Sequence, residues 1–128
     1  MNDMTVIHSG NAPEAVGPYS QAVVSGGVLY ASGQIGLSPA AGKLVADDVE
    51  AQMRQVTENL TAVLNEAGAS ITDIVKVNIF LTDMNDFPRV NKIYANWLGE
   101  HRPARATVAV AALPLAAKVE MDLIARID

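Results

Sequence analysis

Residues 49–68 read VEAQMRQVTENLTAVLNEAG, and they carry the clearest periodic pattern of the chain. Apolar side chains recur there at steps of three and four, which places them on one face of an α-helix. These residues are Val49, Met53, Val56, Leu60, Val63, Leu64 and Ala67. Asp47 or Asp48 can cap the start of such a helix, and Gly68 can follow its end. The stretch therefore predicts an amphipathic helix that packs its apolar face against another layer.

Strand-like segments stand on both sides of this helix. Before it, residues 22–25 and 28–34 are separated by two glycines, a signal for a hairpin turn, and residues 4–8 indicate a shorter first strand. After it, residues 75–81 alternate with period two, which indicates a further strand. One face of that strand takes Val75, Val77, Ile79 and Leu81.

The last third of the chain predicts a second helix and two more strands. Residues 83–99 have an apolar side, and Pro88 fits the first helical turn, where a missing N–H leaves no hydrogen bond unmade. Period-two alternation returns at residues 107–110 and 119–127. The order β-β-β-α-β-α-β-β predicts an α+β fold with one sheet and two helices on one face.

Two helices cover only one face of such a sheet, so the residues of the other face decide what it contacts. We expect that face to mix apolar and polar residues, namely Phe80, Ala109 and Ile124 with Arg105, Thr107, Glu120 and Asp122. A face of this kind is either solvated or packed against other subunits around a polar pocket.

Composition narrows the function classes. At 128 residues the chain has the size of one domain spanning residues 1–128, with 50% apolar and 18% charged residues, which argues against disorder. The absence of cysteine removes disulfides, thiolate nucleophiles and cysteine-based zinc sites. The net charge is −5 and the nine basic residues are spread along the sequence, so we expect no nucleic-acid partner. His8 and His101 lie far apart, and we expect no metal site.

The ends and apolar runs of the sequence bear on its location. The N-terminal residues MNDMTVIHSG lack the basic and apolar regions of a secretory signal. No apolar run approaches the ~20 residues that cross a bilayer. We therefore expect a cytoplasmic protein with no membrane partner.

Arg105 and Glu120 are the charged residues with the clearest chemical potential. The planar fork of Arg105 matches a carboxylate, but an arginine at the start of a strand is also an ordinary surface residue. Glu120 alternates with apolar residues and can exchange protons with water if burial raises its pKa, but it also fits a solvated strand face. If the last two strands pair as a hairpin, both residues fall on one face of the sheet.

A second feature is the Ser32-Gly33-Gln34 segment at the end of a strand. Glycine there lets a ligand approach the main-chain N–H groups, or marks a bulge or tight turn. No lysine-containing, glycine-rich phosphate loop follows, and no Ser-His-Asp triad is recognisable.

Four segments taken in order are similar to the reactive-intermediate deaminase family, RidA/YjgF. They are GPYSQA at 17–22, SGQI at 32–35, KVNIFLTDMNDF at 76–87 with Val90-Asn91, and PARA at 103–106 followed by VEM at 119–121. The resemblance covers essentially the whole chain. It implies a fold like that of the Bacillus-type chorismate mutase and a homotrimer with clefts between subunits.

The resemblance also implies a reaction and a set of residues. The reaction is the hydrolysis of enamines and imines, such as 2-aminoacrylate and 2-iminopropanoate or 2-iminobutanoate, to a 2-keto acid and ammonia without a cofactor. Carried over by position, Arg105 holds the substrate carboxylate with help from the Gly33 main chain, and Glu120 positions or activates water. Catalytic Tyr19 lines the cleft, as do the substrate-binding residues Ser32, Asn91 and Thr107.

Two departures from the family bear on the choice of substrate. Many members have cysteine where this chain has Thr107, and the segment between Trp97 and Arg105 is shorter than in many members. The alternative is a non-catalytic binder of small carboxylates or a regulatory protein with the same fold. The joint presence of Arg105 and Glu120 favours the enzyme, acidity disfavours a ribonuclease, and nothing in the sequence supports a chaperone.

Overall fold

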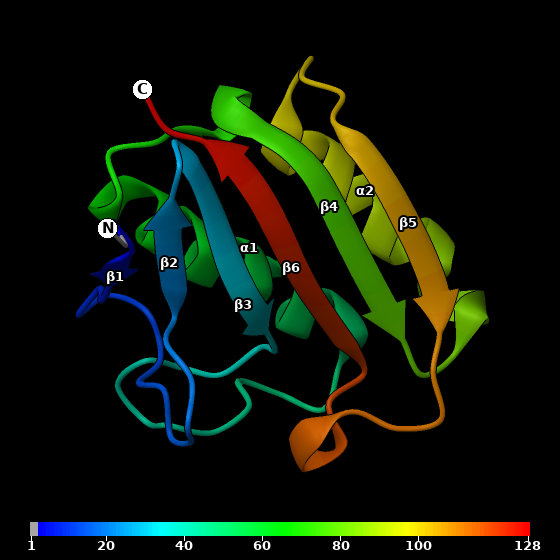
Figure 1. Ribbon diagram of the computed structural model, residues 1–128. Helices are drawn as coiled ribbons and strands as arrows, with labels where there is room; N and C mark the ends of the chain where they lie inside the picture. The colour runs from blue at the N-terminus through cyan, green and yellow to red at the C-terminus, as the bar shows by residue number, and fades with distance from the viewer. Residues whose placement is uncertain (1–2) are drawn as a thin grey trace.

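The computed structural model describes residues 3–128, and within them six strands form one sheet in the order β1-β2-β3-β6-β4-β5. The strands are β1 (Thr5–Ile7), β2 (Ala22–Ser25), β3 (Val28–Gln34), β4 (Ile74–Leu81), β5 (Ala104–Ala109) and β6 (Val119–Arg126). Helices α1 (Val49–Glu66) and α2 (Phe87–Leu98) both lie behind the sheet in Figure 1, and the face toward the viewer is left without a helix. The predicted α+β architecture and element order are confirmed.

Helix α1 forms as its periodicity predicts. The Asp48 carboxylate caps it by accepting a hydrogen bond of 2.9 Å from the N–H of Ala51. The apolar stripe is buried against the sheet, with Val56, Leu60 and Val63 fully inaccessible. This stripe and the facing strand residues form one hydrophobic core between the helices and the sheet.

Helix α2 begins later than predicted. Residues Met84–Asp86 form a short 3₁₀ turn, in which the Asp83 carboxylate accepts a hydrogen bond from the N–H of Asn85, and α2 starts at Phe87. Pro88 lies in its first turn, and Gly99 ends it with a φ of 64°. The local hydrogen bond of Asp83 competes with helix formation, which delays the start.

The hairpin predicted at the paired glycines is present. Gly26 and Gly27 have φ values of 59° and 76°, and β2 and β3 pair antiparallel on either side of them. Two consecutive residues of positive φ form the turn whose twist matches the flanking strands, and glycine adopts them without a Cβ clash.

The last two strands do not pair with each other. Strand β5 pairs in parallel with β4 through the crossover that contains α2, and β6 lies between β3 and β4, antiparallel to both. The hairpin considered for the chain end is therefore wrong. Parallel neighbours need a long crossover, and α2 supplies it. The chain after β5 returns to the middle of the sheet, where β6 pairs with both β3 and β4.

This pairing corrects the predicted composition of the uncovered face. Arg105 is registered with Val77, and Thr107 with Ile79, and both of these partners are inaccessible core residues under the helices. Arg105 and Thr107 thus face the helix side, as does Ala109, whose partner Leu81 is also fully buried. Phe80, Glu120, Asp122 and Ile124 do lie on the uncovered face. The prediction failed for β5 because the polar residues of this edge strand point toward the core side of the sheet, where Arg105 stays exposed at its border and Thr107 is half-buried.

The alternation predicted for β4 also breaks at its start. Val75 is 46% exposed, whereas the preceding Ile74 is buried in the core. The pairing with β6 shifts register between Ile74 and Lys76, which is the signature of a bulge. The extra residue turns Val75 outward, so Val75 does not share a face with Val77.

Buried amide side chains fix the irregular segments to α1. Gln52 is fully buried, donates a hydrogen bond of 2.9 Å to the carbonyl of Ala46 and accepts one of 2.8 Å from the N–H of Lys118. Its backbone also packs against Gly36. These contacts hold the loops before α1 and before β6 at one end of the sheet. Within residues 3–128, no helix has the length and apolar character to cross a membrane.

We predict that Gly36→Ala destabilises the fold. An added Cβ would lie 2.7 Å from Cα and 2.8 Å from the carbonyl oxygen of Gln52, and backbone atoms of α1 cannot rotate away. The free energy of unfolding should fall by about 1–3 kcal/mol, as for other overpacked sites, measured by urea denaturation. Gly10→Ala is the matched control, because no atom lies within 4 Å of its added Cβ. Equal stability of the two variants would contradict the close contact between residue 36 and α1.

Candidate active site

The carboxylate of Glu120 lies over Gly33 on the uncovered side of the sheet. The pairing of β3 with β6 shifts register between Ala31 and Gln34, so Gly33 sits at a bulge. A Cβ at residue 33 would lie 2.9 Å from Cδ of Glu120 and closer still to its carboxylate oxygen. The sequence offered a close approach to the main chain or a bulge as the reason for Gly33, and the structure has features of both. The bulge and the missing side chain together make room for the Glu120 carboxyl group.

The environment of Glu120 favours its protonated form more than water does. Burial raises the pKa of the Glu120 carboxyl, and the neighbouring Asp122 carboxylate raises it further. The group therefore gains and loses a proton closer to neutral pH than an exposed glutamate does. This is the property that a general acid–base group at neutral pH needs.

Glu120 opens into a hollow of about 270 Å³ with mostly apolar walls. Its lining is Pro13, Glu14, Val16, Tyr19, Gly33, Gln34, Ile35, Leu37, Pro114, Leu115 and Glu120. The structure thus brings Tyr19, Gly33 and Glu120 together. Ser32 does not line the hollow; its hydroxyl donates a hydrogen bond of 2.6 Å to the carbonyl of Ser20 and so fixes the loop that carries Tyr19.

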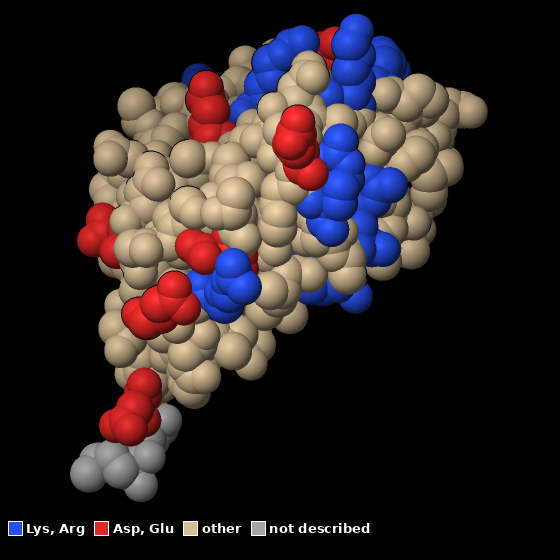
Figure 2. All heavy atoms as spheres, turned by 90° about the horizontal axis from the view of Figure 1, so that it is seen from above, with Lys and Arg blue, Asp and Glu red and all other residues tan. Residues whose placement is uncertain are grey.

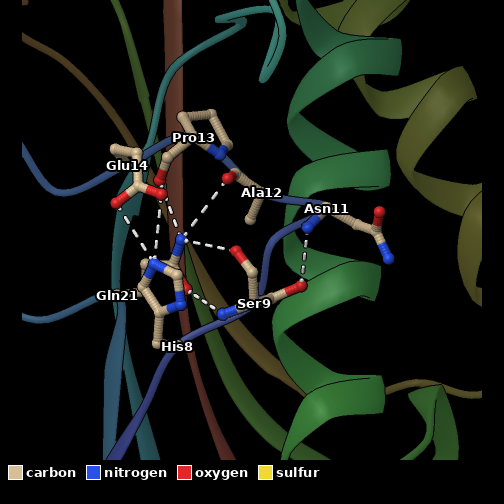
Figure 3. Close-up of polar contacts among 7 residues, drawn as sticks. All are labelled: His8, Ser9, Asn11, Ala12, Pro13, Glu14 and Gln21. Atoms are coloured by element: carbon tan, nitrogen blue, oxygen red, sulfur yellow. Dashed lines mark hydrogen bonds and ion pairs between the residues drawn. The ribbon is translucent and has the colours of Figure 1, made fainter.

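Gln21 shapes the wall of this hollow and is a residue that the sequence analysis did not single out. Figure 3 shows its side chain enclosed by the preceding loop. Its amide donates hydrogen bonds to the carbonyls of Ser9, Ala12 and Pro13 at 3.1, 3.4 and 2.9 Å, and its oxygen accepts one of 2.6 Å from the N–H of Ser9. Gln21 therefore holds Pro13 in the lining, and the neighbouring Glu14 side chain pairs with His8. Its place beside Tyr19 in the GPYSQA segment was the available signal, but burial is not visible in sequence.

Arg105 is held by residues of α2 on the other side of the sheet. Its Nη1 donates a hydrogen bond of 2.6 Å to Oδ1 of Asn91. Its guanidinium carbon lies 5.3 Å from the ring centroid of Phe87 and 5.1 Å from that of Tyr94, which are cation–π distances. The side chain is exposed, and most of its five N–H donors stay available for an anion.

A second hollow, of about 480 Å³, lies beside Arg105. Its lining is Asn91, Tyr94, Ala95, Leu98, Arg102, Pro103 and Arg105, so no acidic side chain of residues 3–128 contributes to it. Burial raises the pKa of the Tyr94 phenol, and the guanidinium groups of Arg105 and Arg102 partly oppose that rise. The hollow suits an anion.

Two buried hydroxyls near Arg105 lack hydrogen bonds. Oη of Tyr94 and Oγ1 of Thr107 have no partner in the part of the chain that the structure describes. Thr107 lies two residues beyond Arg105 on the same face of β5 and does not line either hollow. Buried hydroxyls are almost always paired in proteins, so these two are candidate hydrogen-bonding groups for water, a ligand or another chain.

The predicted site residues thus form two separate groups. Arg105, Asn91 and Thr107 lie on the helix side at the β5 edge, whereas Glu120 and Gly33 lie on the other side with Tyr19 and the supporting Ser32. One chain does not bring Arg105 and Glu120 together. Among residues 3–128, no cluster of three or more histidines or acidic residues has a geometry suited to a metal ion.

Comparison with known proteins identifies the family of this chain. The family model described as endoribonuclease L-PSP matches residues 9–127. The chain belongs to the RidA/YjgF family. A human relative named 2-iminobutanoate/2-iminopropanoate deaminase is 42% identical over 120 residues, which are 94% of this chain and 88% of the human one.

Solved structures agree with this RidA/YjgF assignment. A Rid family protein from Yersinia pestis is 50% identical, with a TM-score of 0.95 over 97% of this chain and 99% of the other. TdcF from E. coli, solved with bound serine, is 40% identical, with a TM-score of 0.92 over 97% of this chain and 99% of TdcF. The fold described above is therefore that of the family.

We predict that Gly33→Ala moves the Glu120 carboxyl group without unfolding the protein. The atoms that a Cβ meets are the far end of a flexible side chain, which can rotate away at little cost in stability. The Glu120 pKa, followed by NMR titration, should fall toward the value of an exposed glutamate, while the melting temperature stays close to wild type. An unchanged Glu120 pKa in a folded variant would show that Gly33 does not determine the position of this carboxylate.

Proposed function

We propose that this chain hydrolyses small imines and enamines that carry a carboxylate, of the 2-aminoacrylate and 2-iminopropanoate type, to 2-keto acids and ammonia. Human, mouse, rat and bovine relatives at 42–45% identity are named 2-iminobutanoate/2-iminopropanoate deaminase. The observation that carries the proposal is the raised pKa of Glu120 in a small apolar hollow. A carboxylate with a raised pKa in such a hollow is a candidate for a general acid–base group.

The reaction requires one water molecule and no net change of charge at the site. The water oxygen bonds to the imine carbon, the C=N π electrons move to nitrogen, and Glu120 takes the proton that the water loses. Glu120 returns that proton to the nitrogen, which completes the carbinolamine. The carbinolamine hydroxyl then passes its proton through Glu120 to the amino group as the C=O bond forms and the C–N bond breaks, so that the nitrogen leaves as ammonia. An enamine first takes a proton on carbon to become the imine. Orientation of water and imine supplies the main rate gain.

The substrate carboxylate is the group that fits Arg105. A guanidinium fork binds a carboxylate through two parallel hydrogen bonds, and the bond to Asn91 together with the two aromatic rings keeps the fork in one orientation. Gly33 and Tyr19 line the same hollow as Glu120, and we expect the Gly33 main chain and the Tyr19 phenol to contact the reacting end of the substrate there. Oγ1 of Thr107 and Oη of Tyr94 are further polar groups on the Arg105 side.

A site with both Arg105 and Glu120 has to be shared between copies of the chain, because one copy keeps them on opposite faces of the sheet. We propose a homotrimer with three such clefts. The uncovered face supports association, since it exposes apolar side chains from several strands: Val6, Tyr30 and Val108, which are 59%, 46% and 45% exposed. In a ring of copies, the β5 edge of one chain meets the Glu120 hollow of the next.

A ribonuclease, which the family description names, finds weaker support. The sequence predicts no cluster of basic residues, but Figure 2 shows most Lys and Arg side chains of the displayed face gathered on one side. Besides the Arg102–Arg105 hollow, Arg54, Arg89 and Lys92 line a groove between α1 and α2. Arg54 pairs there with Glu50, and Arg89 with Asp86, so much of the charge is already neutralised. A phosphate backbone needs a longer unpaired stripe.

The shared site predicts both the mass and the behaviour of mixed assemblies. Light scattering at micromolar concentration should give about three times 13.5 kDa.

Arg105→Gln and Glu120→Gln, each inactive alone, should regain activity when unfolded and refolded together. In an equal mixture, about a quarter of the clefts combine an intact Arg105 with an intact Glu120 from the neighbouring copy. A site contained within one chain would recover nothing, and a stable monomer would contradict the shared cleft.

The roles of the two charged residues are separable by substitution. Arg105→Lys replaces the fork by a point charge, so kcat/KM should fall on the order of 10²-fold, mainly through weaker binding of a stable 2-keto acid, measured by calorimetry. Glu120→Gln keeps the shape and should retain keto-acid binding while kcat falls ~10²–10⁴-fold. Turnover is followed as keto-acid formation from imines released by a pyridoxal-phosphate enzyme. Binding without any acceleration in the wild type would identify a carboxylate-binding protein instead of an enzyme.

A further inference from the structure

The hollow beside Arg105 contains a second guanidinium that the proposed reaction does not use. Arg102 lines it together with Arg105, Asn91 and Tyr94, and the lining drawn from the described chain contains two positive charges and no negative one. A monocarboxylate would neutralise only one of these charges. This local excess of positive charge occurs in a protein whose net charge is −5.

The backbone holds Arg102 in place at the end of α2. Its Nη1 donates hydrogen bonds of 2.7 Å to the carbonyl of Gly99 and 2.9 Å to that of His101. Its Nη2 and Nε form no hydrogen bond with residues 3–128, so they remain available to a ligand. A guanidinium anchored through one nitrogen loses less conformational freedom on binding an anion than a free side chain does.

Both guanidiniums act on the same buried group. Arg105 and Arg102 each favour the ionised form of the Tyr94 phenol, whose hydroxyl is buried without a hydrogen-bond partner in the described part of the chain. Arg102 and Arg105 therefore flank one small region, where two like charges without a counter-ion repel each other. An anion with two negative groups relieves that repulsion, and an anion with one does so only in part.

We infer that this hollow selects substrates with a second anionic group, so that the preferred substrates are imines of dicarboxylic 2-amino acids. Arg105 binds the carboxylate next to the imine carbon, and Arg102 binds the carboxylate at the end of the substrate side chain. Arg102 is thus a specificity-determining residue. The inference rests on the proposed deaminase function and names its substrate class.

The alternative role for Arg102 is purely structural: it caps α2, because a cation at the C-terminus of a helix stabilises that helix. A cap affects stability and leaves the choice between substrates unchanged. The test therefore compares kcat/KM for a dicarboxylic imine, 2-iminoglutarate, with that for 2-iminobutanoate, which has no second carboxylate. Both are released in the assay by amino-acid oxidases, and 2-keto acid formation is timed against the uncatalysed rate.

The wild type should prefer 2-iminoglutarate, and Arg102→Gln should lower the ratio of the two kcat/KM values by about tenfold or more, as expected for loss of a charge-assisted contact. Arg102→Lys should restore part of the ratio. Arg54→Gln is the matched control, because it removes the same charge from a side chain that is 62% exposed on α1, outside the hollow. Its ratio should equal that of the wild type.

If Arg102→Gln leaves the ratio of the two kcat/KM values unchanged, the inference is overturned while the deaminase function stands. This holds whether or not the variant has a lower melting temperature. Failure of the wild type to hydrolyse either imine would instead overturn the proposed function. Calorimetry then still decides the inference, through the affinities for 2-oxoglutarate and 2-oxobutanoate. Tighter binding of 2-oxoglutarate that is lost in Arg102→Gln supports a second anion site, and equal binding of both acids overturns it.

Discussion

The parallel pairing of β5 with β4 is the constraint on which the rest of this structure depends. A parallel partner requires a crossover, and α2 fills that role, which places β5 at the edge of the sheet. Strand β6 enters between β3 and β4 instead and forms the buried centre of the sheet. The register of these pairs determines the face of the sheet on which each functional side chain lies. Arg105 pairs with Val77 on the helix side, and Glu120 pairs with Phe80 on the uncovered side.

Keeping the two charges on opposite faces has an electrostatic consequence. A direct contact between Arg105 and Glu120 would favour the ionised carboxylate and lower the Glu120 pKa. Separation within the chain preserves the raised pKa that burial and Asp122 produce. In the proposed cleft shared by two copies, the carboxylate of the substrate would neutralise the guanidinium. The proposed binding of the substrate by Arg105 and activation of water by Glu120 are therefore compatible in the same small space.

Buried amides give the loops around these sites their shape. Gln21, Gln52 and Asn59 are almost or fully inaccessible, and each donates hydrogen bonds to backbone carbonyls of segments without regular structure. Such carbonyls have no partners in a helix or sheet, and an unpaired buried carbonyl is destabilising. The amides thus supply hydrogen bonds to the irregular segments around the Glu120 hollow that regular secondary structure would otherwise provide.

The sequence by itself determined the elements and their chemistry. The helical stripe at 49–67, the paired glycines of the hairpin and the element order all depend on local backbone preferences and periodic burial, which are properties of neighbouring residues. The four family segments likewise singled out Tyr19, Gly33, Arg105 and Glu120. Tertiary structure decided the rest: the strand order, the bulge that turns Val75 outward, the face of Arg105, the clamp by Gln21 and the position of Arg102. Strand pairing joins residues that are distant in the chain, and an edge strand exposes both of its faces. Alternation along β5 therefore carried no information about which side of the sheet Arg105 would occupy.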